Sequence, residues 1–362
     1  MLFRIVLIGF FLGSFINASA SLSDKQLELK IDAIVMKYLS NPENAGLSIG
    51  IIKEDKEMTY CYGQKNKLTG QKIDSSSIFE IGSITKLFTS LILAEEIRKG
   101  EMRAEDKLCD CFPSGVISEA CSQINLLQLS THSSGLPRLA DNFWPSVNDY
   151  KNPYINYSDK KLYSYLSSAK PAFSTGLHYN YSNVGAGILG FILSMKKGIS
   201  YEAMVNQNVC APFGMNNTCM RLNNDQLLHL ASGHSKGNVV KNWDFQDATA
   251  GQGALKSNIT DMIKFMRYNL YPEQSVLPDA IIYAQKIHFK DYMTGMQTGL
   301  GWHIGRFNNE KYLEHTGGTG GYRSFIGICP ESKMGVIVLS NSDNGVAELG
   351  IEILKELNRI PL

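Results

Sequence analysis

The sequence has no excess of either charge. Its 362 residues include 35 Lys and Arg and 34 Asp and Glu. The only ionisable residue before Ser21 is Arg4, so a chain beginning at Ser21 has 34 residues of each sign and a formal charge of zero. Proteins that bind nucleic acid, or that are held electrostatically at a membrane surface, normally carry a basic excess. We therefore expect neither kind of partner.

Charged residues are also few, at 19% of the chain, while 44% are hydrophobic. Together with 32 Gly and 17 Tyr, this composition argues against disordered, coiled-coil and collagen-like proteins. The length is enough to bury a substantial core. The sequence therefore predicts a neutral, soluble, globular protein, expected to be a monomer, that acts on a small molecule.

Metal-binding patterns are missing. There is no CxxC or HExxH spacing, and the seven His are scattered, so we expect no metal and no cofactor. The seven cysteines suggest local disulfides if the protein enters an oxidising compartment: Cys210 with Cys219, or Cys121 with Cys109 or Cys111. The odd count leaves at least one free thiol or an intermolecular bridge.

Residues 1–20 have the pattern of an export signal. Arg4 precedes an apolar stretch from Ile5 to Ile16, and Ala18-Ser19-Ala20 is a small-residue site of the kind that signal peptidase cleaves. The alternative, a transmembrane anchor, needs roughly 20 apolar residues. No cysteine lies near the site, so we expect no lipid anchor. The prediction is cleavage after Ala20 and release into the periplasm.

The two ends of the chain predict one sheet. A capping box at Ser23–Gln26 begins a helix with Leu27, Ile31 and Ile34 on one face, and strands are expected at 47–53 and 58–64. Strands at 322–328 and 334–339 precede a final helix with the same apolar spacing. We expect an α/β (α+β) fold with residues 21–82 and 239–362 forming an antiparallel sheet flanked by helices. Residues 83–238 would form an inserted, mainly helical lobe.

Two short sequence motifs, GxSxG and GxGxxG, occur here outside the structural context that their usual functions require. Gly46–Gly50 fits GxSxG, which in hydrolases is a sharp turn from strand to helix, yet here it runs into a second strand. Gly185–Gly190 fits GxGxxG but lies inside a helical pattern, without the acidic residue that a dinucleotide site requires. We interpret Ser48 as a strand residue and the glycines as helix-packing positions.

Ser83 and Lys86 are the first candidate catalytic residues. Three positions apart at a helix start, they share a face with Cβ atoms about 5–6 Å apart. A serine hydroxyl needs a base within hydrogen-bond reach, and burial lowers the pKa of a lysine. Leu87 and Phe88 follow directly, so this turn is expected to be partly buried. The helix N-terminus offers free backbone N–H groups where an oxyanion would form.

Two further places point to a cleft. Tyr181 and Asn183 flank one residue just before the Gly-rich helix. The segment His315-Thr316-Gly317-Gly318-Thr319-Gly320-Gly321 leads into a strand, and its lack of bulk would let a substrate backbone approach. Taken singly, each also fits an ordinary turn or hairpin loop.

The combination SxxK, YxN and K/H-T-G, in this order, resembles the penicillin-recognising serine hydrolases, in particular class C β-lactamases and their penicillin-binding relatives. The similarity covers nearly the whole chain after residue 20. Its blocks are Phe79–Phe88, Leu126–Pro137, Ala250–Lys264, Gly299–Gly305 and Ser324–Asn341. It implies a β-lactamase/transpeptidase-like fold with the active site in the cleft between the two lobes.

The resemblance also implies roles. Ser83 would be the acylated nucleophile, and Lys86 and Tyr181 would share the proton relay. The other site residues would bind substrate: Asn183 its amide side chain, Thr316 and Gly317 lining the cleft, and the N–H groups of Ser83 and Gly318 as oxyanion hole.

His315 departs from the family pattern, which has lysine at this position. The lysine in relatives helps to hold a substrate carboxylate. An unperturbed histidine, with pKa about 6.5, is mostly neutral above that pH. We therefore expect weaker binding of anionic β-lactams and tighter binding on acidification, with Arg323 as a possible substitute cation.

Three functions remain open on this fold. The first is a periplasmic β-lactamase that would confer antibiotic resistance. The second is a penicillin-binding D-alanyl-D-alanine carboxypeptidase or endopeptidase, or an esterase. The third is a sensor that β-lactams acylate without turnover.

Overall fold

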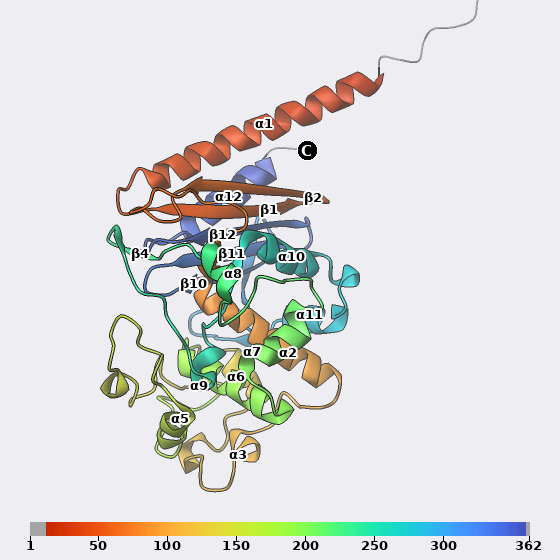
Figure 1. The fold of residues 1–362 in the computed structure, drawn as a ribbon. Helices are drawn as coiled ribbons and strands as arrows, with labels where there is room; N and C mark the ends of the chain where they lie inside the picture. Colours follow the sequence, from red (N-terminus) through yellow and green to blue (C-terminus); the bar gives the residue numbers. More distant parts are fainter. Residues whose placement is uncertain (1–11, 360–362) are drawn as a thin grey trace, which may run out of the picture.

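An eight-stranded antiparallel sheet is built from both ends of the chain, as predicted (Figure 1). The computed structural model describes residues 12–359, with side chains from residue 25. The order is β2–β1–β12–β11–β10–β9–β8–β7, and Leu47 of β1 lies opposite Ser340 of β12. The strands are β1 (Gly46–Lys53), β2 (Lys56–Gly63), β7 (Phe289–Lys290), β8 (Gln297–Thr298), β9 (His303–Phe307), β10 (Glu310–Gly318), β11 (Arg323–Cys329) and β12 (Met334–Ser340).

Helices cover both faces of this sheet. The terminal helices α1 (Leu12–Leu39) and α12 (Ala347–Arg359) pack on one face, where Leu27, Ile31 and Ile353 join a core with the strand side chains. Helix α10 (Ile259–Leu270) packs on the other. The apolar faces predicted for both terminal helices are confirmed.

The start predicted for the first helix is wrong, because α1 begins at Leu12 rather than at the capping box. The residues between contain no proline to end a helix. Residues 1–11 of the predicted export signal lie outside the described residues, and its cleavage stays a prediction. Within residues 12–359, no helix is long and apolar enough to cross a membrane.

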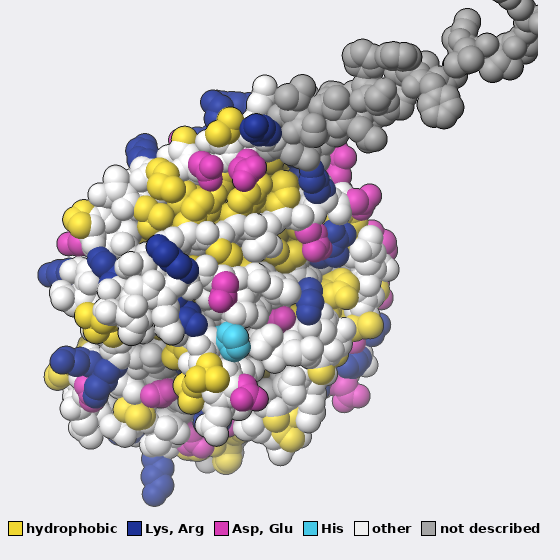
Figure 2. Space-filling view, turned by 45° about the horizontal axis from the view of Figure 1, so that its top comes forward, with side chains coloured by type: hydrophobic (Ala, Val, Ile, Leu, Met, Phe, Trp, Pro, Cys, Tyr) yellow, Lys and Arg dark blue, Asp and Glu magenta, His cyan; other side chains and the backbone are white. Residues whose placement is uncertain are grey.

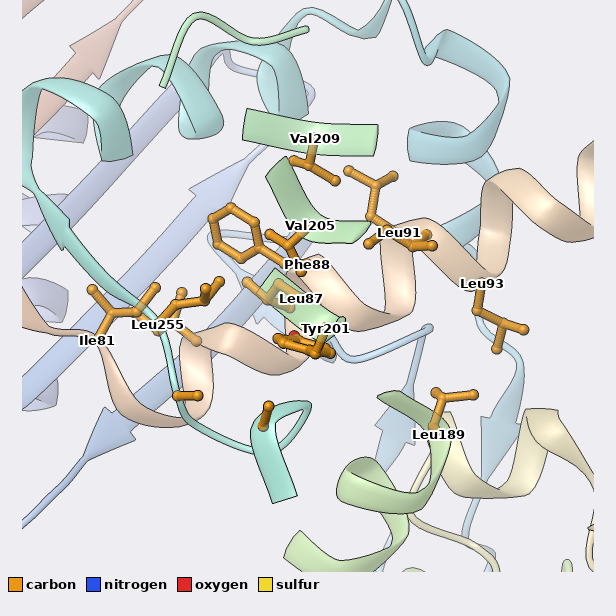
Figure 3. Close-up of a cluster of buried hydrophobic side chains, with 14 of the residues drawn as sticks. Ile81, Leu87, Phe88, Leu91, Leu93, Leu189, Tyr201, Val205, Val209 and Leu255 are labelled. Carbon is orange, nitrogen blue, oxygen red and sulfur yellow. The ribbon is translucent and has the colours of Figure 1, made fainter. Parts of the chain in front are cut away.

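The segment between the two sheet-forming ends is mainly helical, and α2 lies at its centre. Figure 3 shows Leu87, Phe88 and Leu91 of α2 packed among side chains that include Val205 and Val209. Residues 85–96 of α2 are all buried, so the helix is a rigid support for Ser83 and Lys86 at its start. The remaining helices are α3 (Leu108–Cys111), α4 (Leu126–Ser130), α5 (Asp159–Leu166), α6 (Asn183–Lys197), α7 (Tyr201–Val205), α8 (Asn224–His229), α9 (Asp247–Ala250) and α11 (Pro278–Ala284).

Short elements complete this region. Strands β3 (Ile78–Glu80) and β6 (Lys256–Asn258) pair, as do β4 (His234–Ser235) and β5 (Asn238–Val239). The short helical turns are η1 (Gly82–Ile84), η2 (Glu119–Cys121), η3 (Trp144–Ser146), η4 (Asn206–Cys210) and η5 (Pro272–Gln274). The exact boundaries of the two lobes remain a prediction.

Two expectations about local structure are wrong. The seven cysteines are all free thiols, so the predicted pairs are absent; the thiols of Cys109 and Cys121 instead donate to backbone carbonyls of Ser122 and Ala169. Residues 315–318 are not a loop before a strand but the last residues of β10. The sequence did not predict strands β7 and β8, because each has only two residues, too few to show an alternation of hydrophobic and polar side chains.

Both of these short motifs have the structural roles that we expected. Ser48 is fully buried in β1, with its hydroxyl 3.7 Å from the Cys61 thiol. The glycines at 185–190 lie within α6. A Cβ on Gly190 would lie 2.7 Å from the Gly251 Cα atom, so this glycine lets α6 contact the end of α9.

We expect Gly190→Ala to lower the free energy of unfolding by about 1–3 kcal/mol, because the new methyl group would overlap fixed backbone. Gly187→Ala is the matched control in the same helix, since its nearest neighbour would lie at 3.3 Å and alanine gains about 1 kcal/mol of helix propensity. Urea denaturation measures both. Equal stability of the two variants would contradict the packing role.

The surface agrees with the neutral composition. Figure 2 shows Lys and Arg interspersed with Asp and Glu over the face in view, without a large area of one sign. The expectation that no nucleic acid binds stays a prediction.

Candidate active site

Lys86 connects three of the elements around the cleft. Its side-chain nitrogen Nζ contacts Ser83 Oγ at 3.0 Å and donates to Asn183 Oδ1 at 2.9 Å and to the Gln252 carbonyl at 2.7 Å. Ser83 lies in η1, Lys86 in the first turn of α2 and Asn183 at the start of α6. The structure therefore brings the predicted nucleophile and lysine into direct contact.

The environment of Lys86 favours its neutral form, which is the form that can accept a proton. The side chain is 1% exposed, and burial lowers its pKa well below the usual 10.5. The positive charge of Arg138 lowers the pKa further. Near neutral pH, a lysine of this kind can accept the proton of a serine hydroxyl.

We expect Arg138→Gln to move the acid limb of the pH–activity profile to higher pH. Removing a neighbouring positive charge makes protonation of Lys86 easier, so its pKa rises and more alkaline solution is needed to deprotonate it. The profile of kcat/KM against pH measures this. The matched control is Lys151→Gln, which removes a charge from an exposed residue outside the cavity lining. A shift to lower pH, or none, would contradict the coupling.

Tyr181 is protonated at neutral pH. Burial raises its pKa to about 12, and a hydrogen bond with Ser83 and the charge of Arg138 only partly offset that effect. Its ring centroid lies 4.9 Å from Lys86 Nζ. Ser83 therefore contacts both the Lys86 amine and the Tyr181 hydroxyl, and the hydroxyl keeps its proton at neutral pH.

Glycines bring η1 against β10. Gly82 has φ +50°, and a Cβ there would lie 2.5 Å from the Gly318 nitrogen; one on Gly317 would lie 2.1 Å from the Ile81 carbonyl oxygen. Ser324 fixes the same contact by donating to Ile81 O at 2.8 Å. The backbone around Ser83 thus lies directly beside Gly318, where the predicted oxyanion hole would form.

The end of β10 is open on one side. Its pairing with β9 stops at Glu314, whereas its pairing with β11 continues to Gly318 opposite Arg323. Thr316 and Gly318 are exposed. The Gly318 backbone can therefore pair with an extended substrate on this open side, whereas the Thr316 carbonyl already accepts from His315 Nδ1.

Three histidines surround Tyr181. His132 lies 4.4 Å from it, His303 6.3 Å and His315 6.2 Å, all between ring centroids. His303 stacks on His315 at 5.1 Å, and its Nε2 contacts the Tyr179 hydroxyl at 2.8 Å. Burial lowers the pKa of all three, that of His303 to about 4. The group around Tyr181 therefore consists of neutral imidazoles at physiological pH.

The expectations for His315 need correction. It is 1% exposed and does not line the cavity. Its Nδ1 donates to the Thr316 carbonyl at 2.7 Å, while its buried Nε2 has no partner among the described residues. Because burial lowers its pKa, acidification within the physiological range does not charge it. Tighter binding of anions at lower pH through this residue is therefore not expected, since the side chain lies behind the substrate cavity.

A cavity of 750 Å³ contains the site. Ser83, Tyr181 and Asn183 line it, together with the three residues at the end of β10, Thr316–Gly318. Two arginines, Arg138 and Arg323, also line it, and none of the Asp and Glu side chains that the structure describes does. The cavity favours an anionic ligand. Among the described residues, no group of three His, Cys, Asp or Glu side chains is arranged to hold a metal ion.

Several residues of the site carried no separate signal in the sequence. His132, Arg138, Gln252 and His303 all reach Lys86 or Tyr181 through contacts or charge. All but Arg138, which follows Pro137 directly, lie inside the blocks that resemble family segments. Their place inside these family-like segments could have indicated that they lie near the site, but not which residues they contact.

Known proteins resemble this chain over most of its length. The family model described as Beta-lactamase matches residues 31–356. A β-lactamase of Pseudomonas fluorescens is 24% identical over 351 residues, which is 88% of this chain and 94% of that protein. The D-alanyl-D-alanine-carboxypeptidase/endopeptidase AmpH of Escherichia coli (strain K12) is 24% identical over 334 residues, 85% and 84% of the two chains.

A solved class C β-lactamase has the same fold. It superposes with a TM-score of 0.81 at 20% identity, covering 91% of this chain and 96% of its own. The family match extends over most of the chain and includes every element around the cavity. This protein therefore belongs to the Beta-lactamase family, whose members are hydrolases of this serine-enzyme fold.

Proposed function

We propose that the protein is a β-lactamase of the class C type, which hydrolyses the amide bond of β-lactams through an acyl-enzyme on Ser83. The observation that carries the proposal is the contact of the Ser83 hydroxyl with both Lys86 and Tyr181. A serine in hydrogen-bond contact with a base of lowered pKa is the arrangement that nucleophilic catalysis requires.

In the first step, Ser83 Oγ bonds to the lactam carbonyl carbon and its proton passes to neutral Lys86. The carbonyl oxygen becomes an oxyanion between the N–H groups of Ser83 and Gly318. The tetrahedral intermediate then collapses, the C–N bond breaks, and the amine nitrogen takes a proton through Tyr181, which Lys86 reprotonates. Water hydrolyses the Ser83 ester by the same steps in reverse order, which frees the hydroxyl and a carboxylic acid.

Substrate positioning involves the neighbouring groups. Asn183 gives its Oδ1 to Lys86, so its amide N–H groups can donate to a carbonyl of the substrate. Arg323 lines the cavity and pairs with Gly318 across β10 and β11. Its Nη1 group donates to the Thr319 and Tyr322 carbonyls. Its remaining donors can bind the substrate carboxylate.

The second candidate is a penicillin-binding D-alanyl-D-alanine carboxypeptidase or endopeptidase, or an esterase. Two observations favour it: the neutral His315 at the usual lysine position, and the relative that carries the name of a carboxypeptidase/endopeptidase. The acylation chemistry is the same, and the functions differ in how fast water reaches a penicilloyl ester.

Nitrocefin hydrolysis, combined with intact-protein mass after exposure to penicillin, separates the alternatives. Steady turnover supports the β-lactamase. No turnover, with cleavage of D-Ala-D-Ala peptides or short esters, supports the second candidate. A single burst with a stable mass increase indicates a sensor. No reaction with any of these substrates, and no mass increase, would contradict the proposal.

We also propose that the protein is exported to the periplasm after cleavage behind Ala20. The support is the pattern of residues 1–20. N-terminal sequencing of the protein from a periplasmic extract should begin at Ser21, and a mature protein that retains residues 1–20 would contradict export by cleavage.

A further inference from the structure

His132 follows the last turn of α4 in the left-handed conformation, with φ +59°. The Ser133 N–H closes this end of the helix by donating to the Gln128 carbonyl at 3.0 Å. Glycine or asparagine is usual at such a position, because most other side chains are strained there. The ring carries a second cost, since its Nε2 is buried and has no partner among the described residues. A histidine that persists under both costs points to a role for its side chain.

The backbone on both sides of Tyr181 is bonded to His132. The Asn180 N–H donates to the His132 carbonyl at 2.7 Å, and the Ser182 N–H donates to His132 Nδ1 at 3.2 Å. The imidazole also packs on the Tyr181 ring, with 4.4 Å between the ring centroids and 38° between the planes. His132 therefore contacts Tyr181 and both of its neighbours along the chain.

The bond to the His132 ring fixes a peptide that the other bonds of this segment do not reach. The two ends of segment 180–183 donate to carbonyls within residues 136–138, at 2.9 and 3.0 Å, and so does the Ser182 hydroxyl, at 2.7 Å. The Ser182 N–H belongs to the peptide that follows Tyr181, and among the described residues its only partner is His132 Nδ1. The orientation of this peptide sets the direction of the Tyr181 side chain.

We propose that His132 is a positioning residue for Tyr181. By accepting the Ser182 N–H at Nδ1, it holds the Tyr181 hydroxyl in contact with Ser83. The proposal rests on the proposed function, since the role that it assigns is in the acylation of Ser83. A neutral ring that accepts at Nδ1 carries its proton on Nε2. Burial lowers the pKa of His132 well below 6.5, and the charge of Lys86 lowers it further, so the ring stays neutral at physiological pH.

Two substitutions separate the hydrogen bond from the space that the ring fills. His132→Leu keeps a buried apolar side chain but has no acceptor. We expect it to slow single-turnover acylation by penicillin roughly 10- to 100-fold, the loss that follows when a catalytic group moves by about 1 Å. In His132→Asn, Oδ1 is bonded to Cγ as Nδ1 is in histidine, so it can accept the same N–H, and asparagine tolerates the left-handed conformation. This variant should acylate within about fivefold of the wild-type rate.

The dependence of the acylation rate on penicillin concentration distinguishes positioning from loss of the cavity. His132 does not line the cavity. We therefore expect the maximal rate to fall in His132→Leu, while the penicillin concentration that gives half of that rate changes by less than about threefold.

His288→Leu and His288→Asn are the matched controls. His288 Nε2 donates to the Tyr283 carbonyl at 2.8 Å, and its ring lies 4.5 Å from the Tyr283 ring. These variants therefore remove comparable contacts from a histidine that does not line the cavity. We expect both to acylate at the wild-type rate, and the melting temperatures of all four variants show whether the fold is kept.

A second measurement needs no turnover. In wild-type protein with ¹⁵N-labelled histidine, long-range ¹H–¹⁵N spectra should show His132 as the Nε2–H tautomer between about pH 6 and 8. Hydrogen exchange of the Ser182 N–H should be slow in the wild-type protein and roughly tenfold or more faster in His132→Leu, because that variant removes its partner.

Wild-type acylation in His132→Leu, equal losses in His132→Leu and His132→Asn, or an Nδ1–H tautomer in the wild-type protein would overturn the proposal. If His132→Leu does not fold, the wild-type tautomer and the rate of His132→Asn decide. Failure of the proposed function has a different signature: the wild-type protein would show no Ser83-dependent mass increase with penicillin, while the Nε2–H tautomer and the slow exchange of the Ser182 N–H remain.

Discussion

Replacing Ser83 with alanine is expected to abolish covalent labelling by a fluorescent penicillin and to reduce turnover by roughly 10³-fold or more. Within the described part of the chain, this hydroxyl is the only serine oxygen that hydrogen-bonds with Lys86, and alanine removes the atom that forms the acyl bond. The cavity, the backbone N–H groups and Lys86 remain, so substrate still binds. Intact-protein mass after penicillin treatment and the initial rate with nitrocefin measure the two effects.

Ser48→Ala is the matched control for this experiment. Ser48 belongs to the GxSxG pattern, lies buried in the middle of β1 and is absent from the cavity lining. We expect its variant to keep labelling and turnover. Labelling that persists in Ser83→Ala but disappears in Ser48→Ala would show that the short motif, and not the SxxK serine, carries the nucleophile.

Local sequence patterns predicted the parts of this site that depend on local structure. The three-residue spacing from Ser83 to Lys86 fixes their contact on one helical turn, and the structure has it at 3.0 Å. The apolar spacing in both terminal helices predicted their buried faces, and the strands at the two chain ends predicted one sheet. Neighbours along the chain determine the helical contact and the buried helix faces, whereas the single sheet joins distant strands such as β1 and β12.

The remaining features depend on contacts between distant residues. His315 looked like a substitute for a substrate-binding lysine, because the sequence does not show that Tyr181, His303 and Lys86 enclose it. Its burial, and hence its neutral state, follows from packing of three separate elements. The pairing of two loops beside the cavity is similar: Asn152 and Asp244 are far apart along the chain, and no pattern in either loop indicates that they exchange two hydrogen bonds.

Lys86→Met is expected to reduce the rate of acylation roughly 10²- to 10⁴-fold, the range for loss of a general base. Methionine has a similar length and fills the same buried space, but it cannot accept the Ser83 proton. It also leaves the Asn183 side-chain oxygen and the Gln252 carbonyl without their donor. Single-turnover measurement of acylation separates this step from deacylation, and the melting temperature shows whether the fold is kept.

Lys86→Arg then distinguishes the two contributions that a lysine makes here. Arginine keeps the positive charge and the donors but, with a pKa above 12, it does not release a proton at any working pH. If Lys86 acts as the base, Lys86→Arg is about as slow as Lys86→Met, although it retains hydrogen-bond donors. If Lys86 acts only through its charge, Lys86→Arg recovers most of the acylation rate, and the proton of Ser83 must leave through Tyr181. Because the pKa of Tyr181 is raised to about 12, few Tyr181 side chains are ionised at neutral pH, so that route predicts a rate that continues to rise with pH well above neutrality.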